Sequence, residues 1–166
     1  MYTVIEGGVT AAAGFETAST AAGIKYKNRK DMAMIYSEKP CRAAGTFTTN
    51  IVKAAPVKWD QKIVKESEYA QAVVINAGIA NACTGAEGMG YCAETAQAAS
   101  AALNVPESAV LVASTGVIGM QLPMDKLKAG IEAMAPERSG TIESGTEAAK
   151  SIMTTDTKKK EVAVQF

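Results

Sequence analysis

The sequence predicts an α/β fold, in which strands and helices alternate along a chain of 166 residues. Short apolar runs with strand character occur at 72–75 and 109–113. Longer segments with helical periodicity surround them, and the order of elements is β-β-α-β-α-β-α-α-β. Because 48% of the residues are apolar and neither a repeat nor a linker interrupts the chain, we expect one domain over residues 1–166.

The first half of the chain is predicted to form two neighbouring strands, a helix and a further strand. Residues 31–37 (DMAMIYS) and 44–49 (AGTFTT) have the composition of paired strands. Pro56 suits the first turn of a helix, and 57–65 carries apolar residues at helical spacing. The run AVVI at 72–75 is typical of a strand buried on both faces.

The second half begins with a helix and a second buried strand. Residues 91–103 are rich in alanine and are followed by Asn104, which predicts a helix that ends there. Residues 109–113 form the next apolar run. Because 72–75 and 109–113 are both short, apolar and flanked by helices, we expect them to be adjacent or near-adjacent central strands.

Two helices and a terminal strand complete the predicted order. Residues 123–135 have an amphipathic pattern, and 141–153 form another predicted helix. Val162, Val164 and Phe166 alternate with polar residues, as in a strand. Since an uncovered apolar strand recruits other strands, we expect this one to pair with, or lie against, a second chain.

Composition excludes several classes of function. Lys and Arg together number 17, as do Asp and Glu, and the one basic run, 158–160, is typical of a solvated loop, so we expect no nucleic-acid partner. No apolar stretch approaches a membrane span or a secretory signal, and three cysteines without a pairing pattern indicate a reduced, cytoplasmic protein. Cys83 and Cys92 are interpreted as packing residues. The chain has no histidine, so we expect no metal site.

Thr115 and Gly116 are the leading candidates for catalysis. They follow the apolar run 109–113, where a side-chain hydroxyl and a backbone N–H can point at one spot. Two such donors form an oxyanion hole, which stabilises negative charge that develops on a reacting oxygen. A plain turn after a strand is the competing interpretation. Without histidine, the chain cannot supply a Ser-His or Cys-His pair, so it is either no enzyme or half of one.

Two further segments are polar and built from small residues. Residues 76–85 (NAGIANACTG) follow the first buried strand, and they indicate either a site where the backbone approaches a ligand or a tight loop capping the next helix. They lack the lysine of a phosphate-binding loop. Residues 153–157 (MTTDT) indicate either a helix terminus or a cluster that binds a small amino acid.

Four motifs together resemble the ornithine acetyltransferase (glutamate N-acetyltransferase) family of arginine biosynthesis. They are AAGTFTTN with VKAAPV (43–57), NAGIANACTG (76–85), STGVIG (114–119) and MTTDT (153–157), in family order and spacing. The resemblance implies a layered α/β sandwich of the ornithine acetyltransferase and DmpA-like type. It also implies a precursor about twice this length that cuts itself into two chains, of which this sequence resembles the first, or alpha, chain.

The resemblance assigns roles to individual residues. Thr115 and Gly116 match the family's oxyanion pair, and Thr154, with Thr155 as its neighbour, matches the substrate-binding threonine. Asn76, Asn81 and Thr84 lie in the motif at 76–85 and are expected to line the site. The nucleophile is the threonine that begins the second chain, which explains how the family reacts without histidine.

The implied reaction is a ping-pong transfer of acetyl from N-acetylornithine to glutamate, and some members also accept acetyl-CoA. We expect no cofactor, no membrane partner and an α2β2 heterotetramer with the beta chain from the same precursor. Two alternatives remain at this point. One is an aminopeptidase-like hydrolase of the same fold, and the other is a non-catalytic subunit that binds a small molecule.

Overall fold

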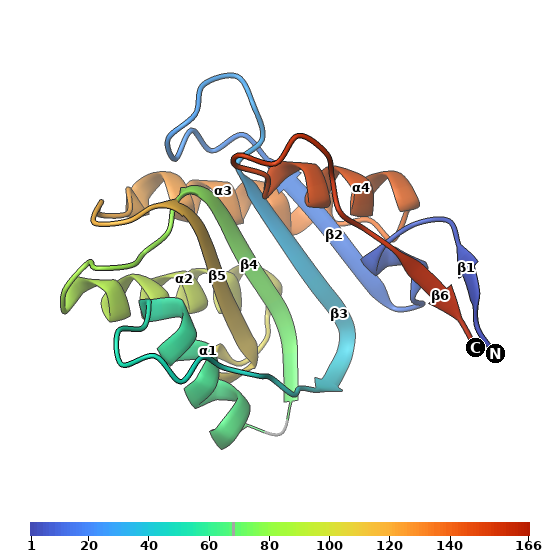
Figure 1. Ribbon diagram of the computed structural model, residues 1–166, viewed down its shortest axis with the longest axis horizontal. Coiled ribbons are helices and arrows are strands. Elements are labelled where there is room, and N and C mark those ends of the chain that lie inside the picture. The colour runs from blue at the N-terminus through green and yellow to red at the C-terminus, as the bar shows by residue number, and fades with distance from the viewer. Residues whose placement is uncertain (68) are drawn as a thin grey trace.

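The protein is built around one four-stranded sheet, to which a separate two-stranded ribbon is attached (Figure 1). The computed structural model describes residues 1–67 and 69–166. The sheet has the order β2-β3-β4-β5 and consists of β2 (Phe15–Thr20), β3 (Met32–Arg42), β4 (Tyr69–Ile79) and β5 (Val110–Val117). Its first three strands are antiparallel, whereas β4 and β5 are parallel. The ribbon pairs β1 (Thr3–Ile5) with β6 (Ala163–Gln165).

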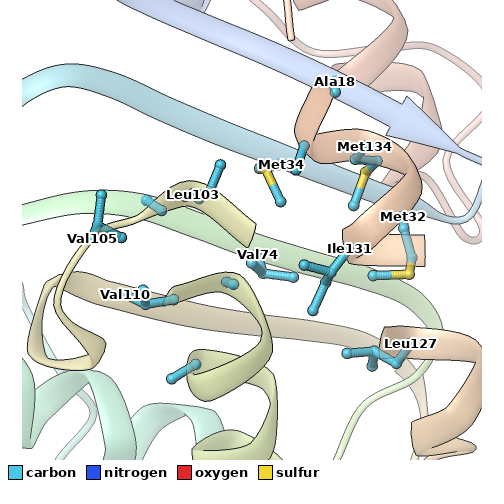
Figure 2. Close-up of a cluster of buried hydrophobic side chains, with 14 of the residues drawn as sticks. Ala18, Met32, Met34, Val74, Leu103, Val105, Val110, Leu127, Ile131 and Met134 are labelled. Atoms are coloured by element: carbon cyan, nitrogen blue, oxygen red, sulfur yellow. The ribbon is translucent and has the colours of Figure 1, made fainter. Parts of the chain in front are cut away.

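The main core lies between one face of the sheet and two helices, α2 (Glu87–Leu103) and α3 (Met124–Met134). Met34 and Val74, which are neighbours across β3 and β4, point toward Ile131 and Met134 of α3 (Figure 2). Alanines on the buried side of α2 bring that helix close to the strands. This packing forms the layered α/β architecture that the sequence predicts.

The opposite face of the sheet is only partly covered. Helix α4 (Ile142–Ser151) packs there against β2, and the Ser144 hydroxyl donates a 2.6 Å hydrogen bond to the Thr17 carbonyl. The face formed by β4 and β5 beyond α4 keeps Val73 and Leu111 half-buried. The expectation that 72–75 is buried on both faces is therefore wrong, because α4 covers the second face only in part and leaves Val73 and Ile75 half-buried.

Helix α1 (Ala55–Glu66) lies beside β5, which is an edge strand of the sheet and not a central one. The adjacency of the two apolar runs is confirmed, since β4 and β5 pair over their lengths. The four predicted helices are present, with Pro56 in the first turn of α1 and Thr141 capping α4 through a bond from the Ser144 N–H.

Two predicted strands need correction. Residues 44–49 belong to no strand, because α1 takes the position beside β5 and β2 takes the position beside β3. The terminal strand exists as β6, but it pairs with β1 of the same chain, and the termini lie side by side (Figure 1). Its apolar side chains Val162, Val164 and Phe166 are nevertheless exposed. No helix in the described part of the chain is long and apolar enough to cross a membrane.

Candidate active site

The predicted oxyanion pair lies near the carboxyl end of β5. The strand continues through Thr115 and Gly116 to Val117, so these residues belong to the sheet and not to a turn that follows it. This corrects the sequence-based placement. Ala77 and Gly78 of β4 are their cross-strand neighbours. Pairing with β4 therefore fixes the backbone, while Thr115 stays half-buried and Gly116 stays exposed.

Neither Gly116 nor Gly78 has room for a side chain, and Gly116 lies directly against the Gly78 backbone. A Cβ on Gly116 would lie 2.7 Å from the Gly78 Cα, and closer still to the Gly78 carbonyl group. Gly116 also has φ +135°, and Gly78 has φ +112°, both in the range that side chains disfavour. A Cβ on Gly78 would in turn lie 2.8 Å from the Lys25 Cβ. The two glycines thus determine the path of the backbone at the proposed donor.

Two adjacent side chains of α1 form hydrogen bonds with backbone groups on the outer edge of β5. The Trp59 Nε1–H donates a 3.1 Å hydrogen bond to the Val110 carbonyl, and the Val112 N–H donates one of 2.9 Å to Asp60 Oδ1. The helix thereby replaces a further strand and protects an edge that would otherwise invite pairing. It also holds β5 in place just before the strand reaches Ser114.

Burial favours the protonated form of both Asp60 and the thiol of Cys92. Desolvation raises the pKa of Asp60 to about 6, partly offset by the hydrogen bond from Val112. Burial, and next the charge of Asp60, raise the pKa of Cys92 to about 12. Cys92 therefore stays a protonated packing residue, because only the thiolate is a competent nucleophile. Cys83, also predicted to pack, is instead exposed.

We expect Asp60→Asn to stabilise the protein at pH 8 and to have a much smaller effect on its stability at pH 4. The folded pKa of Asp60 lies above its unfolded value, so ionisation opposes folding as the pH rises through that interval. The asparagine carbonyl still accepts the Val112 N–H but carries no charge. The gain at pH 8 should be roughly 1 kcal/mol, well below the full shift because the side chain is partly solvated.

Thermal unfolding of the full-length protein and its variant between pH 4 and 8 measures this effect. Asp156→Asn is the control, because the hydrogen bond from Lys160 lowers the pKa of Asp156, so that neutralising it should not stabilise the protein at any pH. A pH-independent difference for Asp60→Asn would contradict the account of Asp60.

The three residues predicted to line the site, Asn76, Asn81 and Thr84, are all buried. Asn81 accepts a 2.9 Å hydrogen bond from the Thr84 hydroxyl and donates one of 3.0 Å to the Gly88 carbonyl in α2. Asn76 donates a hydrogen bond to the Ile79 carbonyl of β4 and accepts one from the Ser114 hydroxyl of β5. Their polar groups thus hold the segment between β4 and α2, and their contact with a substrate stays a prediction.

Asp31 organises the loop between β2 and β3, a role that sequence reasoning missed. Its buried carboxylate accepts hydrogen bonds from the N–H groups of Ala22, Gly23 and Ile24, at 2.8, 3.3 and 2.6 Å. The Asp31 backbone carbonyl accepts a 2.8 Å hydrogen bond from the Ala77 N–H. This bond attaches the loop to β4 near the end of that strand. A lone acidic residue before an apolar run was the only signal in the sequence.

Thr154 and Thr155 lie just after α4, in a segment tied to that same loop. The Arg29 guanidinium donates a hydrogen bond to the Met153 carbonyl. The loop and this segment lie at the edge of the sheet where β4 and β5 end (Figure 1). Thr154 is half-buried and Thr155 is exposed. The structure therefore brings both threonines to the same edge as Thr115.

A hollow of about 350 Å³ lies against β5 on the side of α1. Thr46 and Phe47, from the segment between β3 and α1, line it together with Asp60, Ala113 and Ser114. The family motif at 43–57 thus borders the residue that precedes Thr115. Within the described ranges, no group of three or more His, Cys, Asp or Glu side chains is placed to hold a metal ion.

Residues 16–166 match the model of the ArgJ family. The chain is 50% identical, over 98% of its length, to the arginine biosynthesis bifunctional protein ArgJ of Symbiobacterium thermophilum, and it spans 40% of that protein. It is 47% identical, over 96% of its length, to the protein of the same name from Mycolicibacterium paratuberculosis, and it spans 41% of it. The chain thus spans about 40% of the length of these curated relatives.

Two solved structures are similar over almost the whole chain. One is ornithine acetyltransferase of Mycobacterium tuberculosis, complexed with ornithine, with a TM-score of 0.94 and 45% identity. The other is arginine biosynthesis bifunctional protein ArgJ of Bacillus halodurans, with a TM-score of 0.92 and 38% identity. The match covers 99% of this chain in each case, and 88% and 86% of the respective solved chains.

Proposed function

The chain belongs to the ArgJ family, and we propose that it supplies the oxyanion-stabilising part of an enzyme that moves acetyl from N-acetylornithine to glutamate. The observation that carries the proposal is the position of Thr115 and Gly116 at the accessible end of β5, fixed by pairing with β4. The M. tuberculosis relative is an ornithine acetyltransferase, which supports this choice of reaction.

In the proposed first step, a threonine oxygen from the remainder of the protein bonds to the acetyl carbon of N-acetylornithine. The carbonyl electron pair moves to the oxygen, which accepts hydrogen bonds from the Thr115 hydroxyl and the Gly116 N–H. The C–N bond then breaks, and ornithine leaves with the proton that the threonine hydroxyl has lost. Glutamate takes the acetyl group from the threonine ester in the reverse sequence, through the same oxyanion.

Thr154, with Thr155 beside it, is proposed to contact the amino-acid substrate. Both lie at the sheet edge that carries Thr115, in the segment tied to Arg29 through the Met153 carbonyl. Acetyl passes from one amino acid to another through an ester, so we propose no cofactor. The word "bifunctional" in the names of the relatives supports acetyl-CoA as a second acetyl donor.

The partner that we propose is the remainder of the precursor, cleaved into a beta chain and assembled as an α2β2 heterotetramer. The chain spans about 40% of its relatives, and its exposed apolar side chains, with the half-buried face of β4 and β5, offer surface for such a partner. We place the assembly in the cytoplasm, because each of the three cysteines is free.

We expect residues 1–166 alone to transfer no acetyl from N-acetylornithine to glutamate, whereas the full-length protein transfers it. The reason is that the oxyanion donors cannot act without the nucleophile. Steady-state assays of both proteins, with acetyl-CoA tested separately, measure this difference. Transfer by residues 1–166 alone would contradict the proposal, and release of free acetate without transfer by the full-length protein would indicate a hydrolase.

A further inference from the structure

Asn76 occupies a buried position between the two strands that form the site. It lies on β4, it is 2% exposed, and its cross-strand neighbour on β5 is Ser114, the residue before Thr115. Two residues later along β4 comes Gly78, against which Gly116 packs. Asn76 therefore lies close to both proposed donors without being a donor itself. It faces the residue before Thr115, and it precedes by two residues the glycine that faces Gly116.

Both polar ends of the Asn76 side chain are engaged. The Ser114 hydroxyl donates a 2.7 Å hydrogen bond to Asn76 Oδ1. Asn76 Nδ2 donates a 2.9 Å hydrogen bond to the Ile79 carbonyl. The first bond joins β4 to Ser114, the residue before Thr115. The second spans Gly78, where the backbone has positive φ.

These two tasks require an amide. The side chain must accept a hydrogen bond from a hydroxyl at one end and donate one to a carbonyl at the other. A carboxylate can accept the first bond but cannot donate the second. Since the site is buried, loss of either bond leaves an unpaired polar group and favours a shift of the backbone. A shift here moves Ser114 or Gly78, and through them Thr115 or Gly116.

We propose that Asn76 is a positioning residue for the oxyanion donors, acting on Thr115 through Ser114 and on Gly116 through Gly78. This inference rests on the proposed function. It also gives a specific task to one residue of the motif at 76–85: Asn76 orients the groups that touch the reacting oxygen.

The test is steady-state kinetics of Asn76→Asp, Ser114→Ala and Ser114→Thr in the full-length protein, with N-acetylornithine and glutamate, normalised to the cleaved fraction. Asn76→Asp should lower kcat about 10- to 100-fold with KM changed by less than about 3-fold, because misplaced donors weaken the transition state more than substrate binding. Ser114→Ala should lower kcat about 5- to 10-fold, on the same reasoning. Ser114→Thr keeps the hydroxyl and should restore kcat to within about 3-fold.

Val74→Ala is the matched control, since it opens a cavity in the core from the same strand without touching Ser114 or Gly78. It should lower the melting temperature and leave kcat unchanged. If Asn76→Asp does not accumulate as folded protein, the pair Ser114→Ala and Ser114→Thr decides. Equal kcat for these two variants would overturn the inference.

The double variant Asn76→Asp/Thr115→Ala separates this inference from the proposed function. If Asn76 acts through Thr115, the double variant loses less than the product of the two single losses. A fully multiplicative loss would overturn the inference. If Asn76→Asp and Ser114→Ala keep wild-type kcat while Thr115→Ala is slow, only the role of Asn76 is overturned. If Thr115→Ala keeps wild-type kcat, the oxyanion assignment itself is wrong.

Discussion

Gly116→Ala in the full-length protein is expected to lower kcat by about 10³-fold or more and to destabilise the fold by about 2–4 kcal/mol. The added Cβ would meet the Gly78 backbone, and the residue has φ +135°, so the end of β5 must move away from β4. That movement displaces the Gly116 N–H and carries Thr115 with it. Kinetics and thermal unfolding of the same preparation measure both effects.

Gly119→Ala is the matched control for backbone strain. Gly119 also has positive φ, at +78°, but a Cβ there meets nothing within 4 Å. It should cost about 1 kcal/mol of stability and leave kcat within about 2-fold. Comparable losses of kcat in the two variants would show that strain in this segment, and not the contact with Gly78, determines activity.

Thr115→Ala should lower kcat by roughly 10²- to 10³-fold with a modest change in KM, which corresponds to about 3 kcal/mol of barrier. In the proposed mechanism the hydroxyl donates mainly to the oxyanion of the transition state, so its loss should affect turnover more than substrate binding. Folding should survive, because the Thr115 side chain is only half-buried and belongs to neither apolar cluster. Wild-type unfolding temperature with reduced kcat is the expected combination.

The sequence predicted the helices well because their apolar spacing reflects the core that they bury. Residues 123–135 present Leu127, Ile131 and Met134 on one side, and these three are fully buried in α3. The motif at 114–119 pointed to Thr115 and Gly116, whose role as donors stays a prediction. In both cases the information is local, so a single segment is enough to recognise it.

Features that depend on distant partners escaped prediction. Strand β2 (FETAST) has little apolar character, and its buried Thr17 is satisfied by Ser144 of α4, 127 residues away. Residues 44–49 have strand-like composition but no available neighbour, and strand propensity depends on that context. The contact of Gly78 with Gly116 follows from the register of β4 and β5, which no local pattern specifies.

The most direct test of the account compares kcat of Thr115→Ser with that of Thr115→Ala in the full-length protein. Serine keeps the hydroxyl and loses only the methyl group, so the account predicts kcat within about 5-fold of wild type for serine and roughly 10²- to 10³-fold lower for alanine. Equal kcat for the two variants, whether both fast or both slow, would contradict the claim that the Thr115 hydroxyl stabilises the oxyanion.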